Sequence, residues 1–525
     1  MASLTFMPLT TTLAGSSDPP PRAFFPLLLL HRIPTRICCH RTQSESQSQI
    51  IPTKKQLIPG PARLPLIGNL HNLIGALPHQ ALRNLASQYG PIMHLQLGEI
   101  SAVVVSTPAM AQEILKTQDL NFADRPRLLA AEIATWGSLD IAFSPHGEYW
   151  KQMKRISLTE LLGPRKTLSF RGIRETEVSG FIQSLRNSAG KPVNITEKLL
   201  NLTNRITTKA AFGYQCVDED EFVGLVNSAV KAASGFNVAD LYPSLGFLQD
   251  LTGMKSELLR TRNGLDRIFA KIIKQHQEKR VNGGGDVESD DEDFMDVLLR
   301  LQGTGGFKCP ITSTNIKAVL VDLFIAGTDT SSITMEWAIS EMMKNPRVMR
   351  KAQAEVREAM KGKSIVTEAD IQNLPYLDLV IKETFRLHPP IPLLLPRESK
   401  ERCEIAGYEI AKKTKVIVNA WAIGRDPGAW EEPEHFIPER FDGSEIDFKG
   451  MHFELLPFGA GRRICPGIAL GMANVELPLA QLLYYFDWEL PGGLIADKFD
   501  MEESFGATMS RKNPLYLVAK EVDSN

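Results

Sequence analysis

The sequence predicts a mainly α-helical fold with small β-sheets. Helical periodicity dominates residues 148–278 and returns in a long pattern over residues 312–345. Strand patterns are short and lie toward the two ends of the folded region, and no internal repeat is found. The chain has 525 residues, of which 43% are hydrophobic and 23% charged, so it can bury a large core. We expect one continuous domain over residues 69–525.

The first 44 residues have a composition of their own. Asp18 is their only acid, and Ser, Thr and Pro are frequent. Their arginines are Arg22, Arg32, Arg36 and Arg41. This composition is typical of an organelle transit peptide. The apolar stretch 23–30 is too short to span a bilayer, and Pro26 interrupts it. We interpret residues 1–50 as a targeting or non-globular segment.

A proline-rich hinge is predicted over residues 51–68. It contains Lys54-Lys55, Pro59-Gly-Pro61 and Pro65-Leu-Ile-Gly68. Because proline fixes φ, the segment is expected to be a stiff connector or an ordinary linker.

The first strands are expected to form a hairpin. Residues 91–97 and 102–106 alternate as strands around Gly98-Glu99. Residues 108–116 have helical spacing, and 124–149 are expected to be a loop with apolar side chains. Residues 282–293 are polar and acidic, which is typical of a solvated loop.

Charge and cysteine content exclude several classes of protein. The net charge is -2, so nothing indicates binding of nucleic acid. The six cysteines are scattered without a CxxC pair, which disfavours a zinc site or a disulfide framework and fits a reducing compartment. The ten histidines form no HExxH pattern.

The long helical pattern contains residues that are unusual inside a helix. Ala326-Gly-Thr-Asp-Thr-Ser331 places a glycine and two threonines there, at a cost in helix stability. Small residues at 326 and 327 would let a flat ligand and a diatomic molecule approach the backbone. Asp329 and Thr330 offer an acid beside an alcohol, which suits a proton relay. A helix N-cap is the alternative, but the apolar run 319–325 argues against a helix start here.

A second motif, Lys382-Glu-Thr-Phe-Arg-Leu-His-Pro-Pro390, pairs two charges. Glu383 and Arg386 are three apart, so they share a helix face. Pro389-Pro390 then ends the helix. A buried pair of this kind needs further hydrogen-bond partners.

The third motif is Phe458-Gly-Ala-Gly-Arg-Arg-Ile-Cys-Pro-Gly467. It places Cys465 in a glycine-pinned loop before an apolar helix over 468–486. The Arg463 guanidinium, the loop amides and the positive end of that helix all favour a thiolate. A thiolate beside arginines suits an iron porphyrin, although a buried structural cysteine is the alternative.

These motifs together resemble the cytochrome P-450 family, and the resemblance covers residues 55–520. Phe458, Gly461, Arg463, Cys465 and Gly467 fall at the spacing of its haem-binding loop. It implies the P-450 fold with a single haem-containing domain, and a monooxygenase that inserts one oxygen atom of O2 into a small apolar substrate. Haem b would be the cofactor, and electrons would come from NADPH through a reductase or another donor.

The resemblance also assigns roles to residues. Cys465 would ligate the iron, Asp329 and Thr330 would act in catalysis, and Glu383, Arg386 and Arg440 would form a structural triad. Residues implied to contact haem are Trp150, Lys154, Ala326, Gly327, Arg397, Phe458, Gly459, Arg463 and Gly467. Lys154 replaces the arginine of the family pattern, so a bidentate contact becomes a point charge. Trp150 has a plain core tryptophan as its alternative.

The substrate and the partners are less closely defined. Residues 122–126 and 236–244 resemble the plant branch that oxidises terpenoids and alkaloids. Candidate substrate contacts are Ile133, Trp136, Leu139, Leu393, Leu394 and Thr508, each with core packing as the alternative. A basic face formed by Lys151, Lys154, Arg155, Arg462 and Arg463 would receive an acidic electron donor.

Several alternatives stay open. A related haem-thiolate isomerase or dehydratase would work without a reductase, and a haem-binding sensor would lack catalysis. The family implies peripheral association with the endoplasmic reticulum membrane, whereas the N-terminal composition indicates plastid import or a wrongly assigned first exon.

Overall fold

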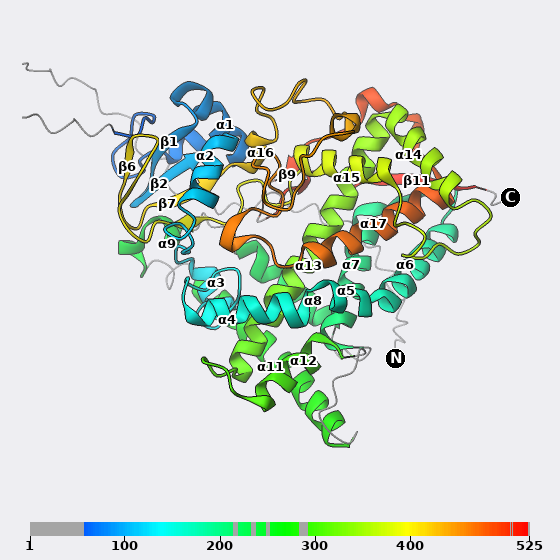
Figure 1. The fold of residues 1–525 in the computed structure, drawn as a ribbon, viewed down its shortest axis with the longest axis horizontal. Coiled ribbons are helices and arrows are strands. Elements are labelled where there is room, and N and C mark those ends of the chain that lie inside the picture. Colours follow the sequence, from blue (N-terminus) through cyan, green and yellow to red (C-terminus); the bar gives the residue numbers. More distant parts are fainter. Residues whose placement is uncertain are drawn as a thin grey trace, which may run out of the picture. The chain divides into compact units, whose positions relative to one another are not determined.

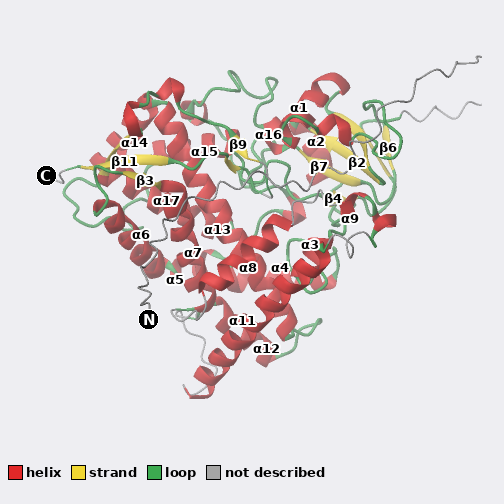
Figure 2. Ribbon diagram, turned by 180° about the vertical axis from the view of Figure 1, so that it is seen from behind, coloured by secondary structure: helices red, strands yellow, loops and turns green. Residues whose placement is uncertain are grey.

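The central element of the fold is helix α13 (Ser313–Lys344), which agrees with the predicted helix over 312–345. Thr312 and Asn315 form a capping box that satisfies amide groups of the first turn. The helix is long and apolar enough to cross a bilayer, but its most apolar window is 67% buried, as expected of a core helix. It runs through the middle of the helical region in both ribbon views (Figures 1 and 2).

The structure is a computed structural model that describes residues 57–213, 219–232, 238–247, 253–282, 292–504, 506 and 508–522. The predicted targeting segment 1–50, hinge residues 51–56 and most of the acidic run 282–293 lie outside these ranges. The described residues belong to one compact unit.

Helices make up most of the described chain. Several begin with proline at the first position, where the missing amide hydrogen costs nothing. The helices before α13 are α1 (Pro78–Tyr89), α2 (Pro108–Gln112), α3 (Leu129–Ala134), α4 (Glu148–Ile156), α5 (Pro164–Ser169), α6 (Arg171–Arg186), α7 (Ile195–Phe212), α8 (Glu219–Ala232), α9 (Val238–Leu241), α11 (Met254–Asn282) and α12 (Phe294–Thr304). Those after it are α14 (Pro346–Ala359), α15 (Pro375–Leu387), α16 (Ala420–Ile423) and α17 (Ile468–Tyr485).

The predicted hairpin forms part of the largest sheet. β1 (Ile92–Leu97) and β2 (Ile100–Val105) pair antiparallel, with Leu97 opposite Ile100. β7 (Lys415–Val418) pairs parallel with β2, and β4 (Arg397–Glu398) pairs antiparallel with β7. The strand order is therefore β1-β2-β7-β4. Figure 1 shows this sheet beside α1 and α2, at the end of the unit away from α14.

The two faces of this sheet bury different clusters, because successive side chains point to opposite faces. One face contributes Ile92, Val103, Val105, Val416 and Val418. The other contributes Met93, Leu95, Leu97, Ala102, Val104 and Ile417, and it packs against α1 and α9.

The remaining strands form smaller sheets. β3 (Pro192–Asn194), β11 (Tyr516–Glu521) and β8 (Phe486–Glu489) form one, in the order β3-β11-β8. β5 (Cys403–Ile405) pairs with β6 (Tyr408–Ile410), and β9 (Glu503–Ser504) pairs with β10 (Ser510–Arg511). The fold is thus mainly helical with small sheets, as predicted.

Helices α7 and α17 cover α13 and form its main contacts. Gly327 makes close approach to α7 possible, because a side-chain carbon at this position would lie 3.2 Å from Thr207 Oγ1. Helices α14 and α15 also contribute side chains to the largest core cluster, together with α7, α13 and α17. The core therefore fixes α13 on several sides and leaves one stretch of it facing a cavity.

Two expectations from sequence are corrected by the structure. The stretch 124–149 is not a continuous loop, since α3 forms within it and α4 begins at Glu148. The helix expected over 108–116 changes character after Gln112 and continues as a π-helical turn, Glu113–Thr117.

Candidate active site

A cavity of about 420 Å³ lies between α13, α3, the segment after α15 and the loop before α17. Its wall combines all three sequence motifs or their neighbours, although they are far apart in the chain. Most of the lining is apolar, and Leu393, Leu394 and Ile417 are typical of it. Such a cavity suits an apolar small molecule held by a few polar groups.

Cys465 lies at the cavity wall in a loop whose shape glycine makes possible. Gly459 and Gly461 have φ values of 66° and 68°. A side-chain carbon on Gly461 would lie 2.0 Å from the Leu115 carbonyl oxygen, so only glycine fits. The Cys465 amide donates to the Phe458 carbonyl at 3.0 Å, which closes the loop.

The surroundings of the Cys465 thiol differ from those expected. Burial raises the pKa of this thiol, whereas a hydrogen bond from the Gly467 amide to Sγ (3.4 Å) and the charge of Lys154 lower it. The expected contribution from Arg463 is wrong, because its guanidinium donates to the carbonyls of Ala123, Ile141 and Ser144. A buried thiol with an amide donor and a nearby cation becomes a thiolate when it binds a metal cation.

A cluster of cations lies at one end of the cavity, of which Arg125 and Arg397 are buried and Lys154 and Arg463 half-buried. It consists of Lys154 of α4, Arg397 of β4, Arg463 and Arg125, and it is called the cation cluster below. Lys154 Nζ donates to the backbone carbonyls of Arg462 and Ile464. Arg397 donates to the Ala460 carbonyl at 2.8 Å and pairs with Asp119 at 3.0 Å.

Arg125 has partners of its own at this end of the cavity. Its Nη1 donates to the carbonyls of Leu395 and Pro396, each at 2.7 Å. Nε donates to the Ala142 carbonyl at 2.8 Å. Arg125 is thus held by neutral carbonyl groups and not by a carboxylate.

Burial and mutual repulsion act on the members of the cation cluster, and the charges of Asp119, Asp124, Asp140 and Asp322 oppose these effects. Burial, with the charge of Arg397, lowers the pKa of Arg463 to about 10. Burial and the charges of Arg463 and Arg397 lower the pKa of Lys154 to about 8, and the same causes hold the pKa of Arg125 well below its usual range. A ligand with two carboxylates, as haem has, would offset the free-energy cost of burying these cations and the repulsion between them. These residues therefore fit haem.

Trp150 supports the cation cluster. Its indole Nε1 donates to the Ile141 carbonyl at 3.1 Å, and the ring is 4% exposed. The Arg463 guanidinium carbon lies 4.2 Å from the ring centroid, and Lys154 Nζ lies 5.3 Å from it. These distances are in the range of cation–π contacts, so the ring helps to orient both cations.

The motif in α13 faces the same cavity. Ala326 is solvent-accessible in the middle of a buried helix, because it lines the cavity. Thr330 Oγ1 donates to the Ala326 carbonyl at 2.6 Å, which is the bond back to the helix that the sequence led us to expect. Burial raises the pKa of Asp329 to about 6. An acid and an alcohol therefore lie side by side at the cavity wall, and the acid titrates near neutral pH.

The structure brings Glu383, Arg386 and Arg440 together, at the end of α15 and in the segment that follows β7. Arg386 forms a bidentate contact with Glu383, at 2.7 and 2.8 Å, and Arg440 Nε donates to Glu383 at 3.0 Å. The Glu383 and Arg386 side chains are fully buried. Arg386 also donates to the carbonyls of Gly424, Pro433 and His435, so the pair has the further partners it needs.

Phe458 belongs to the same support. Its ring contacts Phe385 edge-on, with centroids 5.2 Å apart, and lies 5.4 Å from the ring of Phe448. The loop that carries Cys465 is therefore packed against α15, the helix of Glu383.

The predicted substrate contacts divide into two groups. Leu393, Leu394 and Thr508 line the cavity, but Ile133, Trp136 and Leu139 do not. Helix α3 presents Ala130, Ala131 and Ala134 to the cavity, which turns Ile133 away. Trp136 has φ 52° and packs edge-on against Phe269, with centroids 6.3 Å apart.

The sequence interpretation missed two charged residues of the cavity wall. Arg125 was treated only as part of the plant-like stretch 122–126. Asp322 was passed over within the apolar run 319–325, although an acid in such a run is a signal for a buried polar contact. The predicted basic face is also smaller than expected. Arg463 does not belong to it, because its guanidinium points inward to the Ser144 carbonyl. Lys151, Arg155 and Arg462 are exposed and remain available to a partner.

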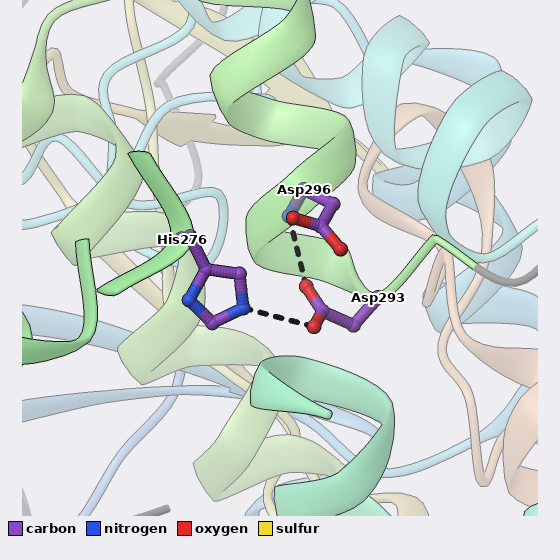
Figure 3. Close-up of side chains that lie close together, drawn as sticks. All are labelled: His276, Asp293 and Asp296. Carbon is purple, nitrogen blue, oxygen red and sulfur yellow. Dashed lines mark hydrogen bonds and ion pairs between the residues drawn. The ribbon is translucent and has the colours of Figure 1, made fainter. Parts of the chain in front are cut away.

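A second cluster of ionisable residues lies between α11 and α12 (Figure 3). His276 Nε2 contacts Asp293 at 2.9 Å, and Asp293 caps α12 by accepting the Asp296 amide at 2.8 Å. His276 Nδ1 faces the Ile272 carbonyl at 2.9 Å. Burial lowers the pKa of His276, but Asp293 and this carbonyl outweigh it and raise the pKa overall. Both ring nitrogens face acceptors, so the arrangement is that of an imidazolium and a helix cap.

Comparison with known proteins identifies the family. The sequence profile of the cytochrome P450 family matches residues 58–518. Desmethyl-deoxy-podophyllotoxin synthase of Sinopodophyllum hexandrum is 52% identical over 464 residues, which are 88% of this chain and 91% of the relative. Premnaspirodiene oxygenase of Hyoscyamus muticus is 49% identical over 496 residues, or 94% and 98% of the two chains. Costunolide synthase of Cichorium intybus is 49% identical over 466 residues, or 89% and 93%.

A solved structure has the same fold. A zebra fish cytochrome P450, determined with progesterone, superposes with a TM-score of 0.73 at 25% identity. The match covers 85% of this chain and all of the other. With its mainly helical fold, its cavity and its near full-length relatives, the chain belongs to the cytochrome P450 family of haem-dependent monooxygenases.

Proposed function

We propose that this monooxygenase hydroxylates a small apolar plant metabolite, such as a terpenoid or an alkaloid. The observation that carries the proposal is that Cys465, the cation cluster and the Asp329–Thr330 pair all line one cavity. The substrate class is supported by the apolar wall and by relatives whose names include premnaspirodiene oxygenase and costunolide synthase. The carbon that is attacked depends on how that wall orients the substrate.

In this proposal Cys465 Sγ is the iron ligand, and the cation cluster binds the haem carboxylates. Haem supplies the oxygen-activating chemistry when it is bound, and a thiolate ligand favours that chemistry. Ala326 and Gly327 are small and would leave room for haem beside α13. Phe458 and Gly459 line the cavity from the loop of Cys465. Trp150 orients two of the cations. Arg125 joins the haem contacts that the sequence led us to expect.

Asp329 and Thr330 are proposed to deliver protons. With a pKa of about 6, Asp329 can both carry and release a proton near neutral pH. Thr330 Oγ1 already holds a proton, which it donates to the Ala326 carbonyl at the cavity wall. If the Thr330 hydroxyl turned to donate its hydrogen bond to a water molecule, it would present that proton to the cavity.

The electrons are proposed to come from NADPH through a cytochrome P-450 reductase or a similar donor. Arg155 and Arg462 are exposed near the Cys465 loop and would attract an acidic surface of the donor. Peripheral association with a membrane is supported by the exposed side chains of Leu64 and Leu66 in the hinge and of Ile74 just after it. Family resemblance supports the reductase and the membrane as partners, in addition to these exposed side chains.

The iron ligand is tested by Cys465→Ala. The wild-type protein should bind haem and show the red-shifted Soret band of a haem thiolate when it is reduced with carbon monoxide. The variant should lose that band, and Cys309→Ala is the matched control because this cysteine lies outside the cavity. A band that persists in Cys465→Ala would contradict the assignment.

The proton relay is tested by Thr330→Ala. Haem binding should be unchanged, because Thr330 bonds only to its own helix. Product formed per NADPH should fall, by up to the roughly hundredfold that a positioned proton donor contributes, with peroxide or water formed instead. Undiminished product yield would exclude the relay, and product formed without NADPH would exclude the proposed electron source.

A further inference from the structure

Asp322 is an acid in an otherwise apolar stretch of α13, and it lines the cavity about one helical turn before Ala326. Its Oδ2 accepts hydrogen bonds from the amides of Ile141 and Ala142, at 2.7 and 2.9 Å. Two amide hydrogen bonds to one carboxyl oxygen hold the backbone of residues 141 and 142 against α13. Asp322 therefore ties residues 139–144, called the anchor loop below, to the helix of Asp329 and Thr330.

The segment that leads into the anchor loop is conformationally strained. Trp136 and Ser138 have φ values of 52° and 58°, in the left-handed region that side chains disfavour. Gly137 between them has φ 94°. Such a conformation persists only where surrounding contacts determine it. The contacts to α13, together with the hydrogen bond from Tyr149 to the Leu139 carbonyl, hold the anchor loop in place.

The carbonyl groups of the anchor loop face the cation cluster. Arg125 Nε donates to the Ala142 carbonyl at 2.8 Å. Arg463 donates to the carbonyls of Ile141 and Ser144, at 3.2 and 2.6 Å. The anchor loop thus presents amides to a carboxylate and carbonyls to guanidinium groups, and each set of hydrogen bonds strengthens the other. It connects α13 to the cations that are proposed to bind haem.

A second carboxyl group stiffens this connection from inside the loop. Asp140 is fully buried and accepts the Phe143 amide at 2.9 Å and the Thr135 hydroxyl at 3.3 Å. Burial raises the pKa of Asp140, and burial together with the Asp140 charge raises that of Asp322. The charges of both acids in turn raise the pKa of Arg125, against the larger effect of its burial. Burying these two acids therefore costs folding free energy, and such a cost is expected where a polar contact has a function.

The anchor loop also forms part of the cavity wall. Ile141, Ala142 and Phe143 all line the cavity, next to the alanines of α3. A shift of these residues would change both the shape of the cavity and the direction of the guanidinium groups that the loop holds. One contact from α13 can therefore influence substrate fit and haem binding together.

We propose that Asp322 is a positioning residue that fixes the anchor loop, and so sets the cavity wall formed by residues 141–143 and the orientation of Arg125 and Arg463. It acts through the loop and need not touch substrate or haem. The inference rests on the proposed function, because the importance of the guanidinium groups depends on their binding haem carboxylates.

The test compares Asp322→Leu, which removes both acceptor oxygens, with Asp322→Asn, which keeps an oxygen and removes the charge. Glu336→Gln is the matched control, since Glu336 is a buried acid of α13 that bonds Thr196 away from the cavity. The first measurement is hydrogen exchange of the peptide 135–150 in the haem-loaded protein. Exchange should rise about tenfold or more in Asp322→Leu, the change that corresponds to about 1.4 kcal/mol, and less in Asp322→Asn.

The second measurement uses two haem-binding probes of different size. Imidazole needs little of the cavity wall, whereas 4-phenylimidazole must pack against it. In Asp322→Leu the Kd of 4-phenylimidazole should rise at least about tenfold while that of imidazole stays within about twofold, because only the larger probe uses the wall. The control should change neither value.

The outcomes separate this inference from the proposed function. Wild-type protein that binds no haem would overturn the proposed function itself. Wild-type protein that binds haem, with Asp322 variants that show unchanged exchange and an unchanged ratio of the two Kd values, would overturn the positioning role alone. If Asp322→Leu does not fold, Asp322→Ala, which also removes both acceptor oxygens, carries the same two measurements, and equality with wild type in both overturns the role.

Discussion

Two groups of buried arginines in this protein have opposite surroundings. In the triad, Arg386 and Arg440 share the carboxylate of Glu383, which also accepts the Ile437 amide at 2.7 Å. In the cation cluster, Arg125 and its neighbours are held mainly by backbone carbonyls. Only Arg397 has a close carboxylate among the described residues, from Asp119.

The difference distinguishes charges that support the fold from charges that await a ligand. A buried charge that has an opposite charge and hydrogen-bond partners within the protein needs no ligand to offset the cost of its burial. A buried group of like charges with neutral partners lacks this compensation, and burial lowers the pKa of its members for this reason. Removing a member of each group should therefore have different consequences.

The largest effect is expected from Arg386→Met. It leaves the Glu383 carboxylate buried with one cation fewer, and breaking a buried pair in this way costs about 3–5 kcal/mol. The free energy of unfolding, measured in urea without haem, should fall by that amount. Arg83→Met is the control, since its pair with Glu434 is partly exposed and should cost less than about 1 kcal/mol. Equal losses would remove the distinction.

A smaller and differently placed effect is expected from Lys154→Met in the cation cluster. The haem-free protein should keep its free energy of unfolding within about 1 kcal/mol, because Lys154 is held by neutral carbonyls and the Trp150 ring and is disfavoured by burial. Haem affinity, measured by titration, should fall about tenfold, because a charged hydrogen bond to haem is lost. Lys154→Arg should keep the affinity, and a large loss of haem-free stability in Lys154→Met would contradict the comparison.

The smallest effect should come from the His276–Asp293 pair, whose charge depends on pH. The pKa of His276 is higher in the folded protein than in the unfolded chain, so its stabilisation is complete below the unfolded pKa. That stabilisation is lost as pH rises through the folded pKa. Its size should be on the order of 1 kcal/mol, the net contribution of one hydrogen bond.

This pH dependence can be isolated with His276→Gln. The unfolding free energy of wild type relative to the variant should decrease from pH 5 to pH 9. Asp293 and Asp296 are the acids that raise the pKa of His276, Lys279 and Arg280 contact Asp296, and all four are retained in the variant. A difference that does not change with pH would show that folding leaves the pKa of His276 unchanged, and would contradict the prediction.

Much of the fold followed from local pattern. The helix over 312–345, the hairpin before residue 106 and the end of α15 before Pro389-Pro390 were predicted because periodicity and proline act locally. The Glu383–Arg386 contact followed from helical spacing, and the partner Arg440 from family resemblance. The loop of Cys465 followed from its glycines and their spacing.

The rest depended on contacts between distant segments. No local pattern shows that α3 turns its alanines to the cavity and Ile133 away, or that a positive φ at Trp136 directs its ring to Phe269. The carbonyls that Arg463 contacts lie more than three hundred residues earlier in the chain. Arg125 and Asp322 were missed for the same reason, since their partners are backbone groups of any sequence.

The contact between Gly327 and Thr207 has a consequence for how this enzyme could acquire new substrates. The position of α13 over the cavity is limited by a hydroxyl on α7, a helix whose residue 207 is itself outside the cavity lining. A smaller residue at 207 would let α13 settle closer to α7 and widen the cavity, whereas a larger one would narrow it. Specificity could thus evolve by changes on α7, without any substitution among the side chains that meet the substrate.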